Sequence, residues 1–436
     1  MEHFNFSTLN LSTCTQVCVA GGGPAGFVAA VAAARSGART TLVESLGFPG
    51  GMATAGLVGP MSKFNFAGRR VVGGIAWEFV ERLAAAGGAI DGLPKGNVPF
   101  EAEAYARVAR EMLEESGVRC LWQTQVCGEP ELAPDGSIAA VALSTAGFLS
   151  RLEAVAFIDC TASGAIVGHH GFGAFRSPRG KAQPLSLCFH LGGVDTERLR
   201  VVVRDDAERS ANATLRAALE KAVASGRIRS FGGPWAVWGS TIRPGFVSVN
   251  ATRAAADVTD AAEIAAATAA MRRDIPEIAE VFREADPAFR GAWIARTAAV
   301  TGFRECREIK ALHRVTAAEF LSGADVPDAI ALAAHPLDRH VAGTSAQTLR
   351  FLERPGAIPL SALVSERCPN LLAAGGLVAA EPEAFASMRV QAQCMATGEA
   401  AGVAAAAAAR SGTPAQRLDF AAIRRSLEER GAITEF

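Results

Sequence analysis

Histidines at three places in the chain have the chemistry for proton transfer. His335 and His340 flank Pro336 and Asp338 in a turn-rich stretch, and His190 lies in an apolar segment whose alternation directs it toward a cavity. A neutral imidazole, with an ordinary pKa of about 6.5, can accept the proton that leaves a carbinol on oxidation. The alternative is that these histidines are purely structural residues of a surface loop or of a strand interior. We therefore predict His340, His335 and His190 as candidate catalytic bases.

Arginines in two further motifs could bind an anionic group. Arg304 and Arg307 stand in the sequence Arg-Glu-Cys-Arg, and Arg389 stands at the start of a helix predicted to begin at Ser387. The guanidinium fork suits a carboxylate or the electron-rich edge of a ring cofactor. A cation at a helix N-terminus opposes the dipole, so Arg389 favours a functional reason. Internal pairing with Glu305 explains Arg304 equally well.

A glycine cluster directly follows the apolar run at 17–20. Gly21, Gly23 and Gly26, with Pro24 and Ala25 between them, fit the spacing G-x-G-x-x-G. In a dinucleotide site the first glycine makes a tight turn, the second admits the pyrophosphate, and the third lets helix and strand pack closely. A glycine-rich turn in an ordinary α/β protein is the plain alternative. The motif predicts a dinucleotide site.

An acidic residue and a second glycine pair narrow the choice of dinucleotide. The next apolar run, 40–43, ends in Glu44 and Ser45, near the spacing of about 20 residues expected for a ribose-binding carboxylate. Gly50 and Gly51, followed by Met52 and Thr54, would let the backbone pass close to a long ligand. Nicotinamide domains rarely need such a segment. The pattern therefore predicts FAD.

The order of the predicted elements positions these motifs on one sheet. Helices are predicted at 27–35, 75–86 and 100–116, and strand-like segments at 118–126, 138–143 and 151–158, with an Asp-Gly turn at 135–136. A later buried strand ends in Gly375 and Gly376, before a small-residue helix at 387–409. Gly398, Ala401, Gly402 and Ala405 fall on one face of that helix and permit close packing.

The middle of the chain has a different character. Strand-like pieces at 185–191 and 246–249 alternate with a charged helical region at 196–225 and a long helix from Asp260 to a boundary at Pro276. Phe231, Trp235 and Trp238 are candidates for an aromatic lid over a ring substrate, with core packing as the alternative. We predict an FAD-binding domain formed by 1–182 and 341–436, and an inserted α+β substrate domain at 183–340.

Bulk properties exclude several classes of function. The net charge of -1 over 436 residues predicts no nucleic-acid partner, and the nine cysteines form no C-x-x-C, so neither a redox pair nor a metal site is predicted. The start of the chain lacks the pattern of a signal peptide, and no apolar run reaches 18 residues. We expect a cytoplasmic protein without a membrane span, and leave open a homo-oligomer.

Together these motifs resemble the FAD-dependent oxidoreductase family with a glutathione-reductase-like FAD-binding fold. The resemblance is carried by residues 21–26, 42–44, 50–54, 158–161, 303–307, 335–340, 358–359, 387–389 and 398–402. It implies an α/β, Rossmann-like fold, places both loop histidines near the reactive site, and adds further FAD contacts: Val126, Thr161, Ala162, Gly375, Gly376, Ser387, Met388 and Arg389. The turn after Asp159 matches the family only at Asp159, Thr161 and Gly164. The absence of histidine from 50–56 argues against a covalent histidyl-flavin there.

Three functions are compatible with these motifs. The leading one is a dehydrogenase or oxidase that transfers a hydride between a small organic substrate and flavin N5, with the electron acceptor undetermined. A flavin hydroxylase using NAD(P)H is the alternative, although a Gly-Asp pair would be expected where Gly375-Gly376 stands. A non-catalytic FAD-binding protein is the third. A disulfide reductase is disfavoured because it would need a second fingerprint and a C-x-x-C.

Overall fold

A five-stranded parallel sheet carries the glycine-rich turn. The computed structural model describes residues 15–91, 96–178, 180–199, 208–235, 241–341, 344 and 346–436, without side chains for 208–212 and 235. The strand order is β20-β9-β1-β2-β5, with β1 Val17–Ala20, β2 Thr40–Val43, β5 Arg119–Leu121, β9 Ala156–Asp159 and β20 Leu371–Ala373. Every residue of β1, β2, β9 and β20 is buried, as expected for a parallel sheet covered on both faces. The predicted α/β class is confirmed.

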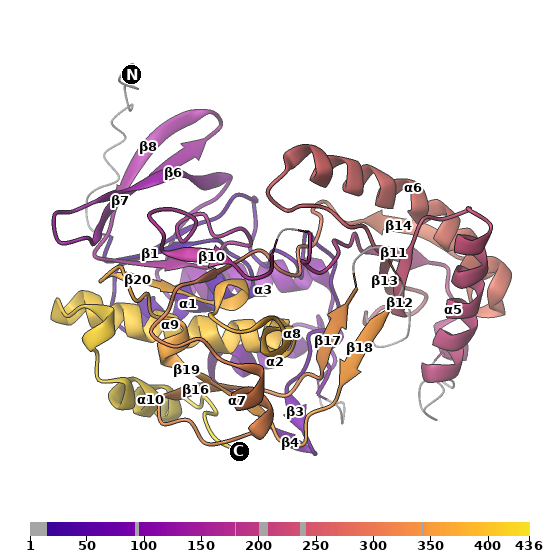
Figure 1. Ribbon diagram of the computed structural model, residues 1–436. Helices are drawn as coiled ribbons and strands as arrows, with labels where there is room; N and C mark the ends of the chain where they lie inside the picture. The colour runs from indigo at the N-terminus through magenta and orange to yellow at the C-terminus, as the bar shows by residue number, and fades with distance from the viewer. Residues whose placement is uncertain are drawn as a thin grey trace.

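Two helices from opposite ends of the sequence pack against each other on one face of this sheet. They are α1 Pro24–Arg35 and α9 Gln391–Ser411 (Figure 1). A Cβ added to Gly398 would lie 2.1 Å from the carbonyl oxygen of Ala25, and one added to Gly402 would lie 2.3 Å from that of Ala29. The small-residue face predicted from the sequence therefore does allow close packing. The helices α2 Gly74–Ala85, α3 Ala102–Glu115 and α10 Phe420–Glu429 complete this layer.

A three-stranded antiparallel meander packs on the other face. Its strands are β6 Thr124–Leu132, β7 Ile138–Thr145 and β8 Phe148–Glu153, and β6 and β7 are joined by the predicted Asp-Gly turn (Figure 1). The single strand predicted at 151–158 is wrong. It divides into β8 and β9 because the chain leaves the meander at 154–155 and enters the parallel sheet beside β1. The segment at 118–126 likewise divides into β5 and β6, at Gln123 with its φ of 52°.

A second, antiparallel sheet forms the middle of the chain. Its order is β12-β13-β11-β14, with β11 Phe189–Gly192, β12 Phe231–Trp235, β13 Val247–Thr252 and β14 Trp293–Thr297. Helices α5 Glu208–Ala224 and α6 Ala261–Ala285 lie against it, at the right of Figure 1. Of the predicted aromatic lid, Phe231 is a core residue; Trp238 and the Trp235 side chain lie outside the described residues.

The helix boundary predicted at Pro276 is wrong, because α6 continues through that residue. A proline inside a helix costs about 3 kcal/mol in lost hydrogen bonding and steric strain. The side chains of Met271, Ile275, Ile278 and Phe282 are all buried on either side of it. Each such side chain contributes roughly 1.5–3 kcal/mol on burial, so their packing offsets the cost.

Two antiparallel strand pairs bear on where the middle unit of the chain ends. Strand β15 Arg307–Ile309 pairs with β10 Gly173–Phe175, and β16 Ala329–Ala333 pairs with β19 Gly356–Pro359. The second hydrophobic core draws on residues 185–298 together with Leu57 and Ala102, whereas 315–334 contribute to the first. We therefore propose that an inserted unit spans about residues 183–304 rather than 183–340.

Short elements complete the described chain. They are the hairpins β3 Asn65–Phe66 with β4 Arg69–Arg70 and β17 Leu337–His340 with β18 Gln347–Arg350, the helices α7 Ala317–Ser322 and α8 Pro382–Met388, and the 3-10 turns Pro287–Phe289, Leu360–Ala362, Gly375–Leu377 and Ala415–Arg417. Across the described part of the chain, no helix combines the length and apolarity needed to cross a bilayer.

Candidate functional site

The glycine turn after β1 has the geometry that its spacing predicts. Gly21 adopts a φ of 90°, and a Cβ on Gly26 would lie 1.7 Å from the carbonyl oxygen of Gly21. A Cβ on Gly23, in contrast, would meet no atom within 4 Å. Gly23 is also the N-cap of α1, where no side chain satisfies the free N–H groups. The turn therefore leaves an open, electropositive helix end that suits a pyrophosphate.

Glu44 is held against this turn by hydrogen bonds. Its carboxylate accepts the backbone N–H of Gly22 at 2.5 Å and that of Leu46 at 2.7 Å, and the Ser45 hydroxyl donates to it at 3.0 Å. A carboxylate offers about four acceptor positions, so capacity remains for a ribose hydroxyl. The acid stands at the carboxyl end of β2, beside the glycine turn, as the sequence predicts.

The two later glycine pairs lie against the first turn. Gly50 donates its N–H to the carbonyl of Gly22 at 2.8 Å, and a Cβ on Gly51 would be 3.1 Å from the Cα of Gly23. A Cβ on Gly375 would lie 2.8 Å from the Cβ of Ala25, whereas one on Gly376 would meet nothing within 4 Å. Segments that are far apart in the sequence thus form one glycine-lined cradle. Its open positions, at Gly23 and Gly376, are where a dinucleotide can approach the backbone.

The helix start predicted at Ser387 is wrong. Ser387 and Met388 form the last turn of α8, Arg389 is its C-cap, and α9 begins at Gln391. Pro382 at the first position of α8 starts a separate helix, and no glycine or proline marks the break between α8 and α9 at 389–390. Arg389 therefore complements the dipole of α8 rather than opposing that of a helix it begins.

The remaining predicted cofactor contacts are placed as follows. Met52 and Thr54 belong to the Gly50 segment, and the Thr54 hydroxyl donates to the carbonyl of Pro49 at 3.1 Å. Ser387 and Met388 are buried, and Ser387 donates to the carbonyl of His335 at 2.5 Å. Val126 is a partly buried residue of β6 that packs at the meander.

The turn after β9 is organised by Asp159. Its fully buried carboxylate accepts the N–H groups of Thr161, Ile166 and Val167 at 2.8–3.0 Å and the Thr161 hydroxyl at 2.7 Å. Burial raises the pKa of Asp159 against the lowering effect of these donors. Ala162, which follows, is exposed. Thr161 and Asp159 therefore hold the turn that meets the glycine motif, where a Cβ on Gly21 would be 2.8 Å from the carbonyl oxygen of Cys160.

His340 and Asp338 form a pair on β17. The Nε2 atom of His340 lies 3.3 Å from Oδ2 of Asp338, and the Arg389 guanidinium donates to the Asp338 carbonyl at 2.9 Å. Burial lowers the pKa of His340 to about 4, with Asp338 raising it and Arg304 and Arg253 lowering it further. For Asp338, burial raises the pKa, but His340 and Arg389 lower it more, so it stays ionised.

His335 joins the same cluster. Its Nδ1 lies 2.8 Å from the carbonyl oxygen of Pro336, and burial lowers its pKa despite the charge of Asp338. The two loop histidines predicted from the sequence are thus brought together with Asp338 and Arg389.

Arg304 and Arg307 diverge although they share a motif. Arg304 donates to the carbonyl of Pro184 at 2.6 Å and belongs electrostatically to the cluster of Arg253, Arg389 and Asp338. Arg307 instead donates to the carbonyl of Ser163 at 2.7 Å and packs on the ring of Phe175. Glu305 between them accepts from Gln183 and Ser177, so the internal pairing predicted as the alternative does not involve either arginine.

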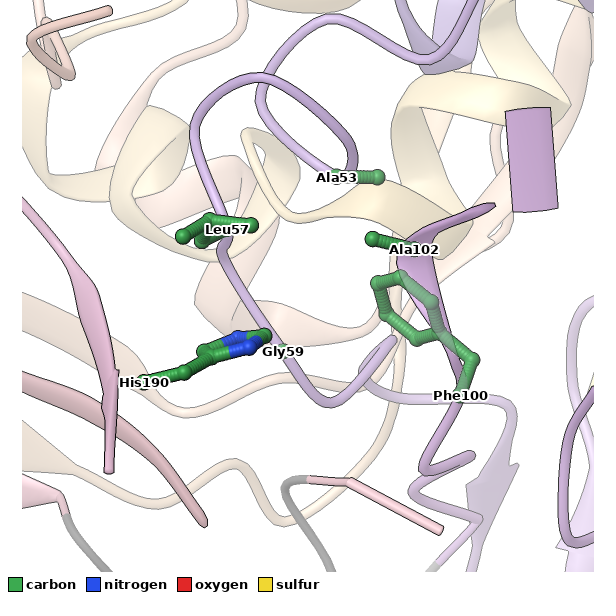
Figure 2. Close-up of a pocket in the computed structure, with 6 residues that line it drawn as sticks. All are labelled: Ala53, Leu57, Gly59, Phe100, Ala102 and His190. Atoms are coloured by element: carbon green, nitrogen blue, oxygen red, sulfur yellow. The ribbon is translucent and has the colours of Figure 1, made fainter. Parts of the chain in front are cut away.

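His190 lines a small hollow at the second sheet. Ala53, Leu57, Gly59, Phe100 and Ala102 line the rest of it. Figure 2 shows the His190 ring reaching toward the loop at Gly59, with Phe100 and Ala102 opposite. Burial, reinforced by Arg296, lowers the pKa of His190 to about 4.

Three important residues were not identified from the sequence. Arg176 is buried and donates to Glu308 and to the carbonyls of Gly376, Val378 and Ala380, so it fixes the segment after β20. Gln183 links Glu305 to the backbone of His340. Arg253 is buried at the end of β13. Each is a single residue outside any motif, and no periodicity marks it.

Among the described residues, no group of histidine, cysteine and acidic side chains could hold a metal ion.

Comparisons with solved structures find distant likenesses over nearly the whole chain. A geranylgeranyl bacteriochlorophyll reductase-like protein of Thermoplasma acidophilum aligns at 13% identity and a TM-score of 0.47, covering 95% of this chain and 82% of that one. The p-nitrophenol 4-monooxygenase PnpA of Pseudomonas putida aligns at 14% and 0.49, covering 97% and 88%. The flavin-dependent brominase Bmp2 aligns at 12% and 0.45, covering 95% and 83%. At these scores the likeness says nothing about the activity of this chain.

No curated protein sequence matches the chain. A family model, described as FAD dependent oxidoreductase, matches residues 16–427. That range includes the glycine cradle, Glu44 and the cluster on β17, and the open positions at Gly23 and Gly376 fit an extended dinucleotide. The chain belongs to the FAD dependent oxidoreductase family and is an FAD-dependent enzyme.

Proposed function

We propose that this enzyme is a dehydrogenase or oxidase that removes a hydride and a proton from a small organic substrate. The observation that carries the proposal is the buried pair of His340 and Asp338 beside the segment that leads into α9. A histidine kept neutral by burial is ready to accept a proton at physiological pH.

The cradle supports a glutathione-reductase-type arrangement of the cofactor. The pyrophosphate would lie on the N-terminus of α1 at Gly23, and Glu44 with Ser45 would hold the ribose diol. The Gly50 segment and the turn at Gly375–Gly376 would flank the rest of the molecule. Bound FAD supplies the two-electron acceptor, because its N5 takes up a hydride.

The protein's own part in the reaction is to orient the substrate and take its proton. In the tautomer of His340 that donates from Nε2 to Asp338, Nδ1 is left as the acceptor. The substrate C–H bond breaks with its electron pair as the hydride departs, an O–H or N–H proton passes to His340, and a C=O or C=N bond forms. His335, whose Nδ1 faces the Pro336 carbonyl, leaves its Nε2 available as a second acceptor.

Anaerobic mixing of the purified yellow protein with a panel of alcohols, amines and hydroxy acids tests the proposal. Bleaching of the flavin by a panel member supports a dehydrogenase or oxidase. Bleaching by NAD(P)H alone would overturn it in favour of a hydroxylase. A flavin that none of these reduces would point to a non-catalytic FAD-binding protein. Subsequent admission of oxygen separates an oxidase, which is reoxidised quickly, from a dehydrogenase.

A further inference from the structure

Three arginines from different segments meet beside His340. Arg253 follows β13, Arg304 precedes β15, and Arg389 caps α8. Arg253 and Arg389 both act electrostatically on Arg304 and lower its pKa, after burial as the main cause. The backbone explains the meeting, because Leu185 and Ala254 exchange hydrogen bonds at 2.8 and 3.2 Å and Arg304 donates to the neighbouring Pro184 carbonyl.

The cluster has more positive charge than its acidic residues balance. Asp338 is the carboxylate shared by Arg389 and His340. Within the described part of the chain, no carboxylate lies within ion-pair distance of Arg253 or Arg304. The carboxylate of Glu305, which follows Arg304 in the sequence, already accepts hydrogen bonds from Gln183 and Ser177. An uncompensated cation in a buried position is costly unless a ligand supplies the opposite charge.

The hydrogen bonds of the three guanidiniums are also incomplete. Arg253 bonds through Nη1 to Asn250 and Thr252, but its Nε and Nη2 have no partner; Nε of Arg389 has none either. Among the described residues, Arg304 donates one hydrogen bond, from Nη1 to the Pro184 carbonyl. Arg304 and Arg389 are partly accessible, whereas Arg253 is buried.

The cluster borders the cofactor cradle on one side. A Cβ on Gly302, two residues before Arg304, would lie 2.9 Å from Cε of Met52 in the Gly50 segment. The Cys394 thiol, in the first turn of α9, donates to the Arg389 carbonyl at 3.3 Å, and Cys394 Sγ is 3.7 Å from the Cβ position of Gly375. Arg253 belongs to the second sheet and not to the cradle, which favours a substrate over the cofactor as its partner.

We propose that Arg304 and Arg389, together with the buried Arg253, bind a carboxylate group of the substrate and so hold the oxidised carbon beside His340. The proposal deepens the proposed function, on which it rests for the identity of the reacting partner. Guanidinium and carboxylate form paired charge-assisted hydrogen bonds, which fix orientation as well as position. The substrate class is therefore a carboxylic acid with an oxidisable C–H bond, such as a hydroxy or amino acid.

Matched pairs of carboxylates and amides test the binding site with the holoenzyme. The probes are acetate with acetamide, succinate with succinamide, and benzoate with benzamide, read by the flavin absorbance change and by the thermal midpoint. At least one carboxylate should bind at least ten-fold more tightly than its amide. Arg304→Gln should remove that preference, and Arg253→Gln should weaken it. Arg307→Gln, from the same motif but bonded to Ser163, is the matched control and should retain it.

The two proposals fail in different ways in this experiment. Equal binding of amides and carboxylates, or no binding of any carboxylate, overturns the carboxylate site even if every arginine variant is too unstable to measure. FAD titration of the apoprotein separates the cofactor from the substrate: an Arg304→Gln protein that loses FAD affinity but keeps the carboxylate preference also overturns the site. Carboxylates that bind without any panel member reducing the flavin would leave the site standing and remove the proposed oxidation.

Discussion

The Nε2 atom of His340 lies 3.3 Å from Oδ2 of Asp338, two residues earlier on the same strand. Alternate residues of a strand share a face, so the pairing follows directly from β17 being extended. The strand thus fixes the orientation of the imidazole without help from a distant segment, while the hydrogen bond from the His340 N–H to Gln183 at 3.0 Å anchors its backbone.

Replacing His340 with asparagine should slow reduction of the flavin while FAD stays bound. Loss of a positioned general base typically costs about 10²–10⁴-fold in rate. Stopped-flow absorbance under anaerobic conditions gives the rate, and the visible spectrum gives the FAD content. His313→Asn is the control, because His313 pairs with Glu319 at the surface of α7. An unaltered reduction rate in the His340 variant would remove it as the base.

The rate of flavin reduction should be constant through neutral pH and should fall only in acid. His340 accepts a proton only when neutral, and its pKa of about 4 keeps it so above about pH 5. Arg304 and Arg253 lower that pKa, and a bound carboxylate would screen their charges. At saturating substrate the fall of the reduction rate in acid should therefore begin at a higher pH. Reduction rates from pH 4 to 8 at low and high substrate concentrations check both statements. A decline that begins between pH 7 and 8 would contradict the assignment.

Two alanine substitutions in the glycine turn should affect different properties, one the affinity for FAD and the other the stability of the fold. Gly23→Ala should leave the fold intact, because its φ of -66° suits any residue and its Cβ meets nothing, but should block the approach of the pyrophosphate. Gly26→Ala should destabilise the protein itself, because its Cβ would overlap the Gly21 carbonyl at 1.7 Å. Thermal midpoints of the apoproteins and FAD titrations separate the two effects. Equal FAD affinity in Gly23→Ala and wild type would show that the cofactor does not pass there.

Substituting Glu44 should weaken retention of FAD. Alanine leaves the N–H groups of Gly22 and Leu46 without an acceptor and removes the ribose partner, whereas glutamine keeps an acceptor and loses only the charge. We expect FAD affinity to fall in the order wild type, Glu44→Gln, Glu44→Ala. Fluorescence titration of the apoproteins measures it. Undiminished affinity in the alanine variant would exclude Glu44 as the ribose-binding acid.

Glu399 should make the fold less stable as pH rises. This acid in α9 accepts the Ile75 N–H at 2.9 Å, its Oε1 has no partner, and burial raises its pKa from 4.5 to about 7. The folded state therefore holds a proton that the unfolded state releases, so stability is lost between about pH 4.5 and 7, by up to about 3 kcal/mol. Denaturant unfolding at pH 5 and 8 should show a smaller difference for Glu399→Gln than for wild type. The same difference in both proteins would contradict the buried, protonated acid.

The cradle could be predicted from the sequence because its parts are local motifs. Gly21, Gly23 and Gly26 lie within six residues, and the closest contact of a Cβ on Gly26 is the Gly21 carbonyl of the same turn. The break between α8 and α9 could not be predicted because no glycine or proline lies between Ser387 and Gln391, although Pro382 marks the true start of α8.

The arginine cluster could not be predicted in the same way. Arg253, Arg304 and Arg389 come from three segments that only the packing of two sheets brings together. Arg304 and Arg307 show most clearly what a motif does not predict. They share one motif, but Arg304 donates to the carbonyl of Pro184 and Arg307 to that of Ser163. Arg307 is the first residue of β15 and Arg304 precedes that strand, and the sequence alone does not fix where the strand begins.

The contact of α1 with α9 joins an early and a late segment of the chain. Gly398 and Gly402 lie against Ala25 and Ala29, more than 370 residues apart in the chain. The first helix therefore lacks this packing partner until residues 398–402 have been synthesised. A chain stopped before residue 398 would carry the entire glycine fingerprint without the helix that packs against it.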